Sequence, residues 1–146
     1  MNNPITNFRK NFEALKKRLP NDVAILALKH YDLNFKKQGF DGQKWQEVQR
    51  RIEGTKANKY AKKPQRTKAI LSGKTQLLAK SNYIKQASWD KIVIANSAKS
   101  DKGYNYGFAH NYGTSKLPQR KFLGNSIVLN KKIVNFVGSQ LNKVFK

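Results

Sequence analysis

The chain has 146 residues, no cysteine and a formal net charge of +22 at pH 7, with 30 Lys and Arg against 8 Asp and Glu. A chain of this length suits one hydrophobic core, and the lack of cysteine excludes a disulfide framework, a thiolate zinc site and a cysteine nucleophile. The charge attracts polyanions, whether nucleic acid, an acidic protein face or an anionic membrane surface, without choosing among them.

No stretch approaches the roughly 20 consecutive apolar residues that a membrane-spanning helix needs. The first four residues, Met1 to Pro4, lead into no apolar signal core. We therefore expect an untargeted protein with no membrane partner, built as a single domain over 1–146 with a flexible basic arm at about 40–68.

The N-terminal part carries two helical patterns. Asn3 and Pro4 suit a helix N-cap and first-turn proline. Apolar residues then recur at spacings of three and four: Ile5, Phe8, Phe12, Leu15 and Leu19. Pro20 to Asp22 interrupts, and a second pattern runs from Val23 to Phe35 and stops at Gly39. The sequence predicts two helices here, or one helix with a sharp break.

From Gly39 to about Arg66 the apolar periodicity disappears. The stretch begins rich in turn residues and continues polar and basic, with Glu53 as the one acidic residue between Arg50 and Lys68. This composition predicts a long loop or arm, mobile when alone and ordered by a partner. An acidic protein and a phosphate backbone both suit it. The candidate contact residues are Lys56, Lys59, Tyr60, Lys62, Lys63, Arg66 and Lys68.

A sheet signal follows the arm. Segments 77–86 and 91–95 flank a short polar turn at 87–90, which predicts an antiparallel hairpin. A short helix is expected from Tyr104 to Asn111, ending at Gly113, and a short strand at 121–123. Helical spacing from Ile127 to Val144 predicts a C-terminal amphipathic helix. The fold class is therefore α+β, a small antiparallel sheet packed with N-terminal and C-terminal helices.

Catalytic groups are sparse. His30 and His110 lie in separate predicted elements, and no His, Cys, Asp or Glu spacing matches a metal motif. We interpret His30 as a packed or helix-surface histidine and His110 as a structural or interface residue rather than a general base. The carboxylates do not converge in sequence, so we expect solvated acidic residues and no catalytic residue, cofactor or metal.

Five short motifs follow one another along the chain. They are GFDGQKW at 39–45, RTKAILSG at 66–73, KIVIA at 91–95, YGFAHNYG at 106–113 and LPQRKFLG at 117–124. In this order they resemble the phage virion-morphogenesis or tail-completion family over about residues 35–126. The pairing of the fourth motif with the Pro-x-Arg-x-Phe-Leu segment close behind it is the most specific part of this resemblance.

The resemblance implies a small, non-enzymatic α+β subunit of a phage or prophage that acts in tail completion or head-tail joining as part of a ring. Its partners would be neck, tail or portal subunits and further copies of itself, a homo-oligomer, with DNA contact as a further possibility. It would reside in the virion, and in the host cytoplasm during assembly. The alternative is a basic nucleic-acid-binding accessory protein, which the charge favours although no recognisable motif supports it.

Several residues are assigned to an interface or junction. Under the family resemblance, Phe122 is a buried anchor and Arg120 a hydrogen-bonding fork before the C-terminal helix, although both also suit ordinary fold residues. Tyr106 and His110 belong to the fourth motif and are interface candidates. Of the two tryptophans in turn-rich stretches, we expect Trp45 at an interface and Trp89 as a local core plug.

Overall fold

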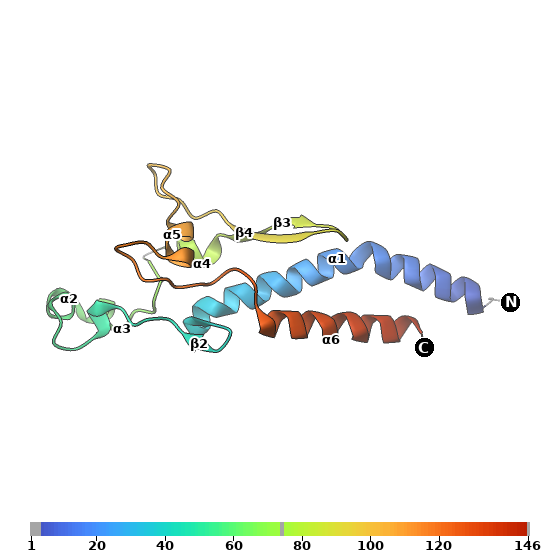
Figure 1. Cartoon of the computed structure of the whole chain (residues 1–146), viewed down its shortest axis with the longest axis horizontal. Helices are drawn as coiled ribbons and strands as arrows, with labels where there is room; N and C mark the ends of the chain where they lie inside the picture. The colour runs from blue at the N-terminus through green and yellow to red at the C-terminus, as the bar shows by residue number, and fades with distance from the viewer. Residues whose placement is uncertain (1–3, 74, 146) are drawn as a thin grey trace.

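The computed structural model describes residues 4–73 and 75–145 and has an α+β fold (Figure 1). The molecule is elongated, with helix α1 (Pro4–Lys37) as its spine and helix α6 (Ile127–Val144) alongside. Both chain ends lie at one end of the molecule, and the basic arm lies at the other. Helices and a small antiparallel sheet are thus present as predicted.

Helix α1 is continuous through Pro20, so the expectation of two separate helices is wrong. A proline inside a helix removes one backbone hydrogen bond and crowds the preceding turn, and Figure 1 shows α1 bending near its middle. Burial of Leu19 and Val23 on either side of the proline keeps the chain helical, because both side chains pack into one cluster with α6. The Asn3 cap lies outside the described residues.

The α1–α6 pair forms the first of two apolar clusters. Leu15, Leu19 and Val23 of α1 are buried there against Ile133 and Val137 of α6, among others. The apolar residues near the N-terminal end of α1 are not buried in this cluster, and Ile5 is 74% exposed. Helix α6 begins as predicted after residues 124–126, because the Ser126 side chain accepts the Leu129 amide as an N-cap.

A two-stranded antiparallel sheet contacts α1. Strands β3 (Asn82–Ala87) and β4 (Ile92–Asn96) form the predicted hairpin. The segment before it is helix α4 (Leu77–Lys80) rather than an extension of the strand, which corrects the prediction for these residues. Asn96 Nδ2 donates to the Leu78 carbonyl and to Asn82 Oδ1. The strand begins at Asn82.

A second apolar cluster fills the space between α1, the loops and α4. Its buried members are Phe35, Trp45, Ile70, Leu78, Ala98 and Phe122. Phe35 is central, with its ring centroid 5.7 Å from Trp45 and 4.9 Å from Phe122. Trp45 is only 8% exposed and Trp89 is 60% exposed. The structure therefore reverses our assignment of the tryptophans, since Trp45 fills the core and Trp89 faces solvent.

Short elements occupy the stretch predicted as a loop. Strands β1 (Gly39–Phe40) and β2 (Gln43–Lys44) form a hairpin around Asp41 and Gly42, whose positive φ values of 48° and 87° suit an Asp-Gly turn. Three single-turn helices follow: η1 (Gln49–Arg51), α2 (Lys56–Tyr60) and α3 (Lys63–Thr67). None of these three helices contains a buried residue, so side-chain burial contributes little to holding them.

Helix α5 (Tyr106–Tyr112) confirms the predicted short helix and ends at Gly113, whose φ is 78°. The strand predicted at 121–123 does not form. Its backbone groups bond side chains instead of a neighbouring strand: the Phe122 and Leu123 amides donate to Asn111 Oδ1, and Phe122 O accepts from Asn34. In the described part of the chain no helix is long and apolar enough to cross a membrane.

Candidate functional site

Four of the five sequence motifs meet at one place in the fold, which we call the motif junction and define by Trp45, Ile70, Asn111, Arg120 and Phe122. All five side chains are buried. Trp45 Nε1 donates to the Lys121 carbonyl at 2.7 Å, which ties the first motif to the last. The sequence order of these motifs therefore reflects one set of tertiary contacts.

Asn111 organises the junction through its side chain. Its Oδ1 accepts the Phe122 amide at 2.8 Å and the Leu123 amide at 2.9 Å. Asn34 of α1 donates to the Phe122 carbonyl at 3.0 Å, so both backbone polar groups of Phe122 are satisfied by side chains. Neither asparagine was predicted as a site residue, because an asparagine that bonds a distant part of the backbone cannot be told from a surface asparagine in the sequence.

Arg120 and Phe122 both lie buried at the motif junction. Phe122 is 1% exposed and Arg120 is 6% exposed. Arg120 Nε donates to the Gln46 carbonyl at 3.2 Å, and its backbone amide donates to the His110 carbonyl at 2.8 Å. Burial and the nearby Arg50 guanidinium lower the pKa of Arg120, while Glu47 opposes the shift.

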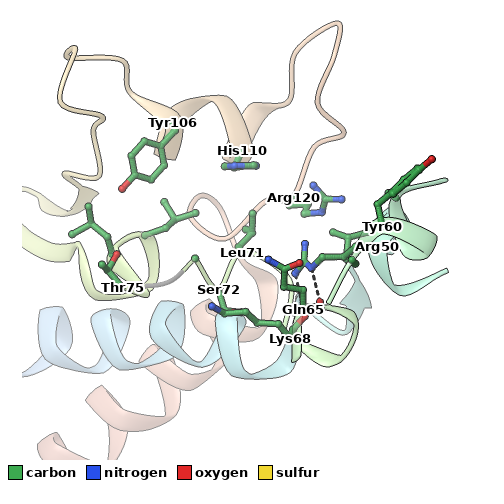
Figure 2. A pocket seen from close by; sticks show the side chains of 16 residues that line it. Arg50, Tyr60, Gln65, Lys68, Leu71, Ser72, Thr75, Tyr106, His110 and Arg120 are labelled. Carbon is green, nitrogen blue, oxygen red and sulfur yellow. Dashed lines mark hydrogen bonds between the residues drawn. The ribbon is translucent and has the colours of Figure 1, made fainter. Parts of the chain in front are cut away.

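An open cleft of about 730 Å³ lies between the basic arm and the α4–α5 side of the junction (Figure 2). Arg120, His110 and Tyr106 come from the motif junction side, while Arg50, Tyr60 and Lys68 come from the arm. The remaining lining residues are Val48, Ala57, Ala61, Gln65, Leu71, Ser72, Gly73, Thr75, Leu77 and Leu78. The cleft is thus apolar in much of its wall and basic in its charge.

Arg50 fixes the arm beside this cleft. Its Nε donates to the Gln65 carbonyl at 3.0 Å, and one terminal nitrogen donates to the carbonyls of Lys68 and Ala69, each at 3.1 Å. These bonds close the chain between residues 50 and 69 into a loop. Arg50 was not among the predicted contact residues, because the basic residues of this run look alike in the sequence. Only the fold shows that Arg50 bonds the backbone of the arm.

Leu71 and Gln38 shape the wall behind the arm. Leu71 has φ of 58°, in the left-handed region that bulky residues avoid. Gln38 Oε1 accepts both the Ile70 amide at 2.8 Å and the Arg51 guanidinium at 2.9 Å. The Gln38 side chain holds the segment before Leu71 in place. Residues with strained backbone, such as Leu71, cluster at binding and catalytic sites.

His110 lines the cleft without a hydrogen bond on one ring nitrogen. Among the described residues its Nδ1 is a buried side-chain nitrogen with no partner. Burial and the Arg120 charge lower the pKa of His110 from its ordinary value of 6.5, so the ring is neutral at pH 7. The lowered pKa weakens this imidazole as a proton acceptor, and among the described residues no partner of Nδ1 orients the ring.

The predicted contact residues of the arm divide into two groups. Tyr60 and Lys68 line the cleft. The others lie outside its lining and are exposed: Lys56, Lys59, Lys62, Lys63 and Arg66. Arg66 bonds the carbonyls of Ala61 and Lys59, so its guanidinium is used within the arm. Tyr60 is 81% exposed, which leaves its ring open to a partner at the rim.

A separate polar cluster joins Ser126, His30 and Asp41, residue types that also form hydrolase triads. Ser126 Oγ donates to Asp41 and accepts the Leu129 amide. His30 Nε2 lies 3.2 Å from Ser126 Oγ, and Lys132 Nζ lies 3.5 Å from His30 Nδ1. Since the lysine donates to Nδ1, Nε2 carries the proton and donates to the serine, which is the reverse of a general base.

The cluster therefore caps a helix rather than activating a nucleophile. Ser126 is 2% exposed, so a substrate cannot reach its hydroxyl. Asp41 also accepts the Ile127 amide at 2.8 Å, which satisfies another donor at the start of α6. Burial and Lys132 lower the pKa of His30, in agreement with a neutral packed histidine. The sequence pattern predicted the start of this helix but did not identify Ser126 as its cap or Asp41 as a partner.

No group of three or more His, Cys, Asp or Glu residues within 4–73 and 75–145 is arranged to hold a metal ion. Comparison of the chain with family models, with curated proteins and with solved structures finds no match. The function is therefore argued from the motif junction, the cleft and the charge.

Proposed function

We propose that this protein is a non-enzymatic structural subunit of phage or prophage virion morphogenesis, which acts in tail completion or head-tail joining as one copy in a ring. The observation that carries the proposal is the motif junction. Four motifs that resemble the family in order supply Trp45, Ile70, Asn111 and Phe122 to one buried cluster and its hydrogen bonds. Contacts among four motifs that follow one another in sequence give their order a structural reason.

The shape and charge support the same proposal. A rigid α1–α6 pair carries the chain ends at one end of the molecule and the basic arm at the other, so the two ends can contact different neighbours. The net charge of +22 disfavours close contact between uniformly charged surfaces and favours acidic partners or the DNA that passes through a ring. Neck, tail or portal subunits are the proposed partners, in the virion and in the host cytoplasm during assembly.

The test is removal of the gene from its host, followed by electron microscopy of the induced lysate beside a lysate with the gene restored. The proposal expects separate heads and tails, or tails of aberrant length, in the deletion and normal particles after complementation. Normal particles in normal numbers from the deletion strain would refute it.

A second candidate function is nucleic-acid binding. The observation in its favour is the exposed face of the arm, where Tyr60 stands among Lys56, Lys59, Lys62 and Lys63. Lysines that track phosphates and a tyrosine that stacks on a base bind single strands without sequence preference. This function predicts that DNA affinity falls steeply as salt rises, with a shallower slope in a variant that lacks the four lysines. Weak binding that ignores the arm would exclude it.

A further inference from the structure

The Arg120 guanidinium carries a charge with no paired carboxylate. The side chain is 6% exposed, and its Nε donates a hydrogen bond to the neutral Gln46 carbonyl. The ion pairs found among the described residues do not include Arg120. Glu47, the carboxylate that acts on it electrostatically, is already paired with Arg51 at 3.4 Å. A buried charge without a counter-ion is costly, and an external anion would relieve that cost.

Arg50 increases the need for such an anion. Its guanidinium lies beside that of Arg120 in the cleft, as Figure 2 shows. The three carbonyl bonds of Arg50 orient it without neutralising it. Lys68 adds a third basic side chain, and no carboxylate lines the cleft within the described part of the chain. Planar guanidinium groups suit a carboxylate, because both groups are flat and bond through two parallel contacts.

The other walls of the cleft identify the surroundings of that anion. Leu71, Leu77 and Leu78 form an apolar wall, and Val48, Ala57 and Ala61 extend it on the arm side. Leu77 is 47% exposed, so about half of its surface is open to a ligand in the cleft. A ligand that places a carboxylate between apolar side chains would satisfy the guanidinium groups and cover this wall together.

We propose that the cleft binds an acidic peptide segment of a neighbouring subunit, whose carboxylate pairs with Arg120 beside Arg50 while flanking apolar side chains cover Leu71 and Leu77. The inference rests on the proposed function for the source of the segment, and on the cleft alone for its chemistry. It assigns the motif junction a second role, because Arg120, which bonds the carbonyls of Gln46 and His110, also presents the charge.

Nucleic acid suits this cleft less well than a peptide. A phosphate backbone presents a charge at every nucleotide and needs an open track of cations. The lysines that would make such a track lie outside the cleft lining, and the charged groups inside sit against apolar walls. A buried Arg120 guanidinium beside the half-buried Arg50 suits one or two carboxylates better than a polymer of phosphates.

The test measures fluorescence anisotropy of labelled probes with the full chain at about 0.15 M salt, where exposed charges are largely screened. The first probe is a capped decapeptide that alternates glutamate with leucine, and the second replaces every glutamate with glutamine. The third probe is a decamer of thymidylate. The proposal expects the first probe to bind at least about tenfold more tightly than the second, since a charge-assisted hydrogen bond contributes about that factor.

Two variants locate the binding, and one serves as a control. Arg120→Gln removes the charge from the cleft, and Leu77→Glu adds a carboxylate at an exposed position on the first turn of α4, where it is compatible with the helix. Each should weaken the glutamate–leucine probe about tenfold or more. Arg9→Gln removes the same charge from an exposed site on α1 and should leave the affinity within about twofold.

Equal binding of the first probe to the wild type and to Leu77→Glu would overturn the proposal, even if Arg120→Gln fails to fold. Preference for thymidylate over the first peptide, lost in Leu77→Glu, would assign the cleft to nucleic acid instead. Cleft-specific peptide binding together with normal particles from the deletion strain would refute the proposed function and leave the peptide-binding cleft in place. Defective particles without peptide binding would do the opposite.

Discussion

The motif junction and the basic arm face each other across the cleft, and different kinds of contact hold them. In the junction, buried side chains bond backbone groups that are distant in sequence, such as Asn34 with Phe122 and Trp45 with Lys121. In the part of the arm from residue 49 to residue 69, the hydrogen bonds span fewer than about twenty residues, as with Arg50 and Ala69, and no helix residue is buried. Contacts that join distant segments are lost only when the fold opens, whereas local bonds open singly.

This difference suits a protein with one fixed and one adaptable side to its cleft. The junction presents Arg120 at a fixed position because its Nε and backbone amide are both bonded. The arm presents Tyr60 at the end of α2 and Lys68 just after α3, and neither helix has a buried residue. A partner that enters the cleft would order the second side against the first, and interface burial would offset the loss of entropy.

The largest expected effect comes from Phe122→Ala. Phe122 is 1% exposed and packs on Phe35, so its removal leaves a cavity and should lower the free energy of unfolding by about 3–5 kcal/mol. Chemical denaturation measures the loss. Phe108→Ala is the matched control, because Phe108 is 62% exposed and should change stability by less than about 1 kcal/mol. Equal losses in the two variants would contradict the placement of the junction.

Asn111→Ala should destabilise the protein by about 2–3 kcal/mol, because the buried Phe122 amide and the half-buried Leu123 amide lose their shared acceptor. Asn130, which is exposed on α6, provides a control that should stay within about 0.5 kcal/mol on change to alanine. Thermal unfolding monitored by circular dichroism compares the two. A loss below that of the control would show that the Asn111 bonds do not hold the junction.

Thr55→Ala tests the arm. Thr55 accepts the Asn58 amide as the N-cap of α2 and donates to the Gln49 carbonyl. Loss of this cap should destabilise the arm locally by about 1 kcal/mol. Amide hydrogen exchange measured by mass spectrometry should become faster in residues 49–61 and stay unchanged in α1 and α6. Faster exchange throughout the chain would mean that the arm and the junction unfold together.

The smallest expected effect is a pH dependence that belongs to the junction side. The pKa values of His30 and His110 are lowered in the folded protein from an ordinary value of 6.5, mainly by burial. Below pH 6.5 the unfolded chain therefore binds more protons, and stability falls as pH falls. Denaturation between pH 8 and pH 5.5 should show a plateau above about pH 7 and a decline below it.

The double variant His30→Asn and His110→Asn provides the control for this pH dependence. Its stability at pH 8 will differ from that of the wild type, but its decline between pH 7 and pH 5.5 should be shallower. An unchanged slope in the double variant would assign the decline to other groups.

Local sequence patterns predicted the elements whose contacts are close along the chain. The β3–β4 hairpin, helix α5 with its Gly113 end, and helix α6 after Ser126 all form as expected, because turn residues, caps and apolar spacing act within a few positions. The fold class followed from these elements. The basic composition of the arm predicted a loop, and the structure instead has the short helices η1, α2 and α3 there.

Long-range contacts decided the rest. The continuity of α1 through Pro20 depends on its packing against α6. The strand predicted at 121–123 is missing because the Asn111 side chain bonds its backbone. Trp45 rather than Trp89 fills the core because Trp45 packs on Phe35. The cleft itself depends on Arg50 and Arg120, which are 70 positions apart in the numbering and meet only in the fold. The sequence determined the charge and the local elements, and tertiary structure alone brought two guanidinium groups together, because their proximity is set by buried contacts that no local pattern records.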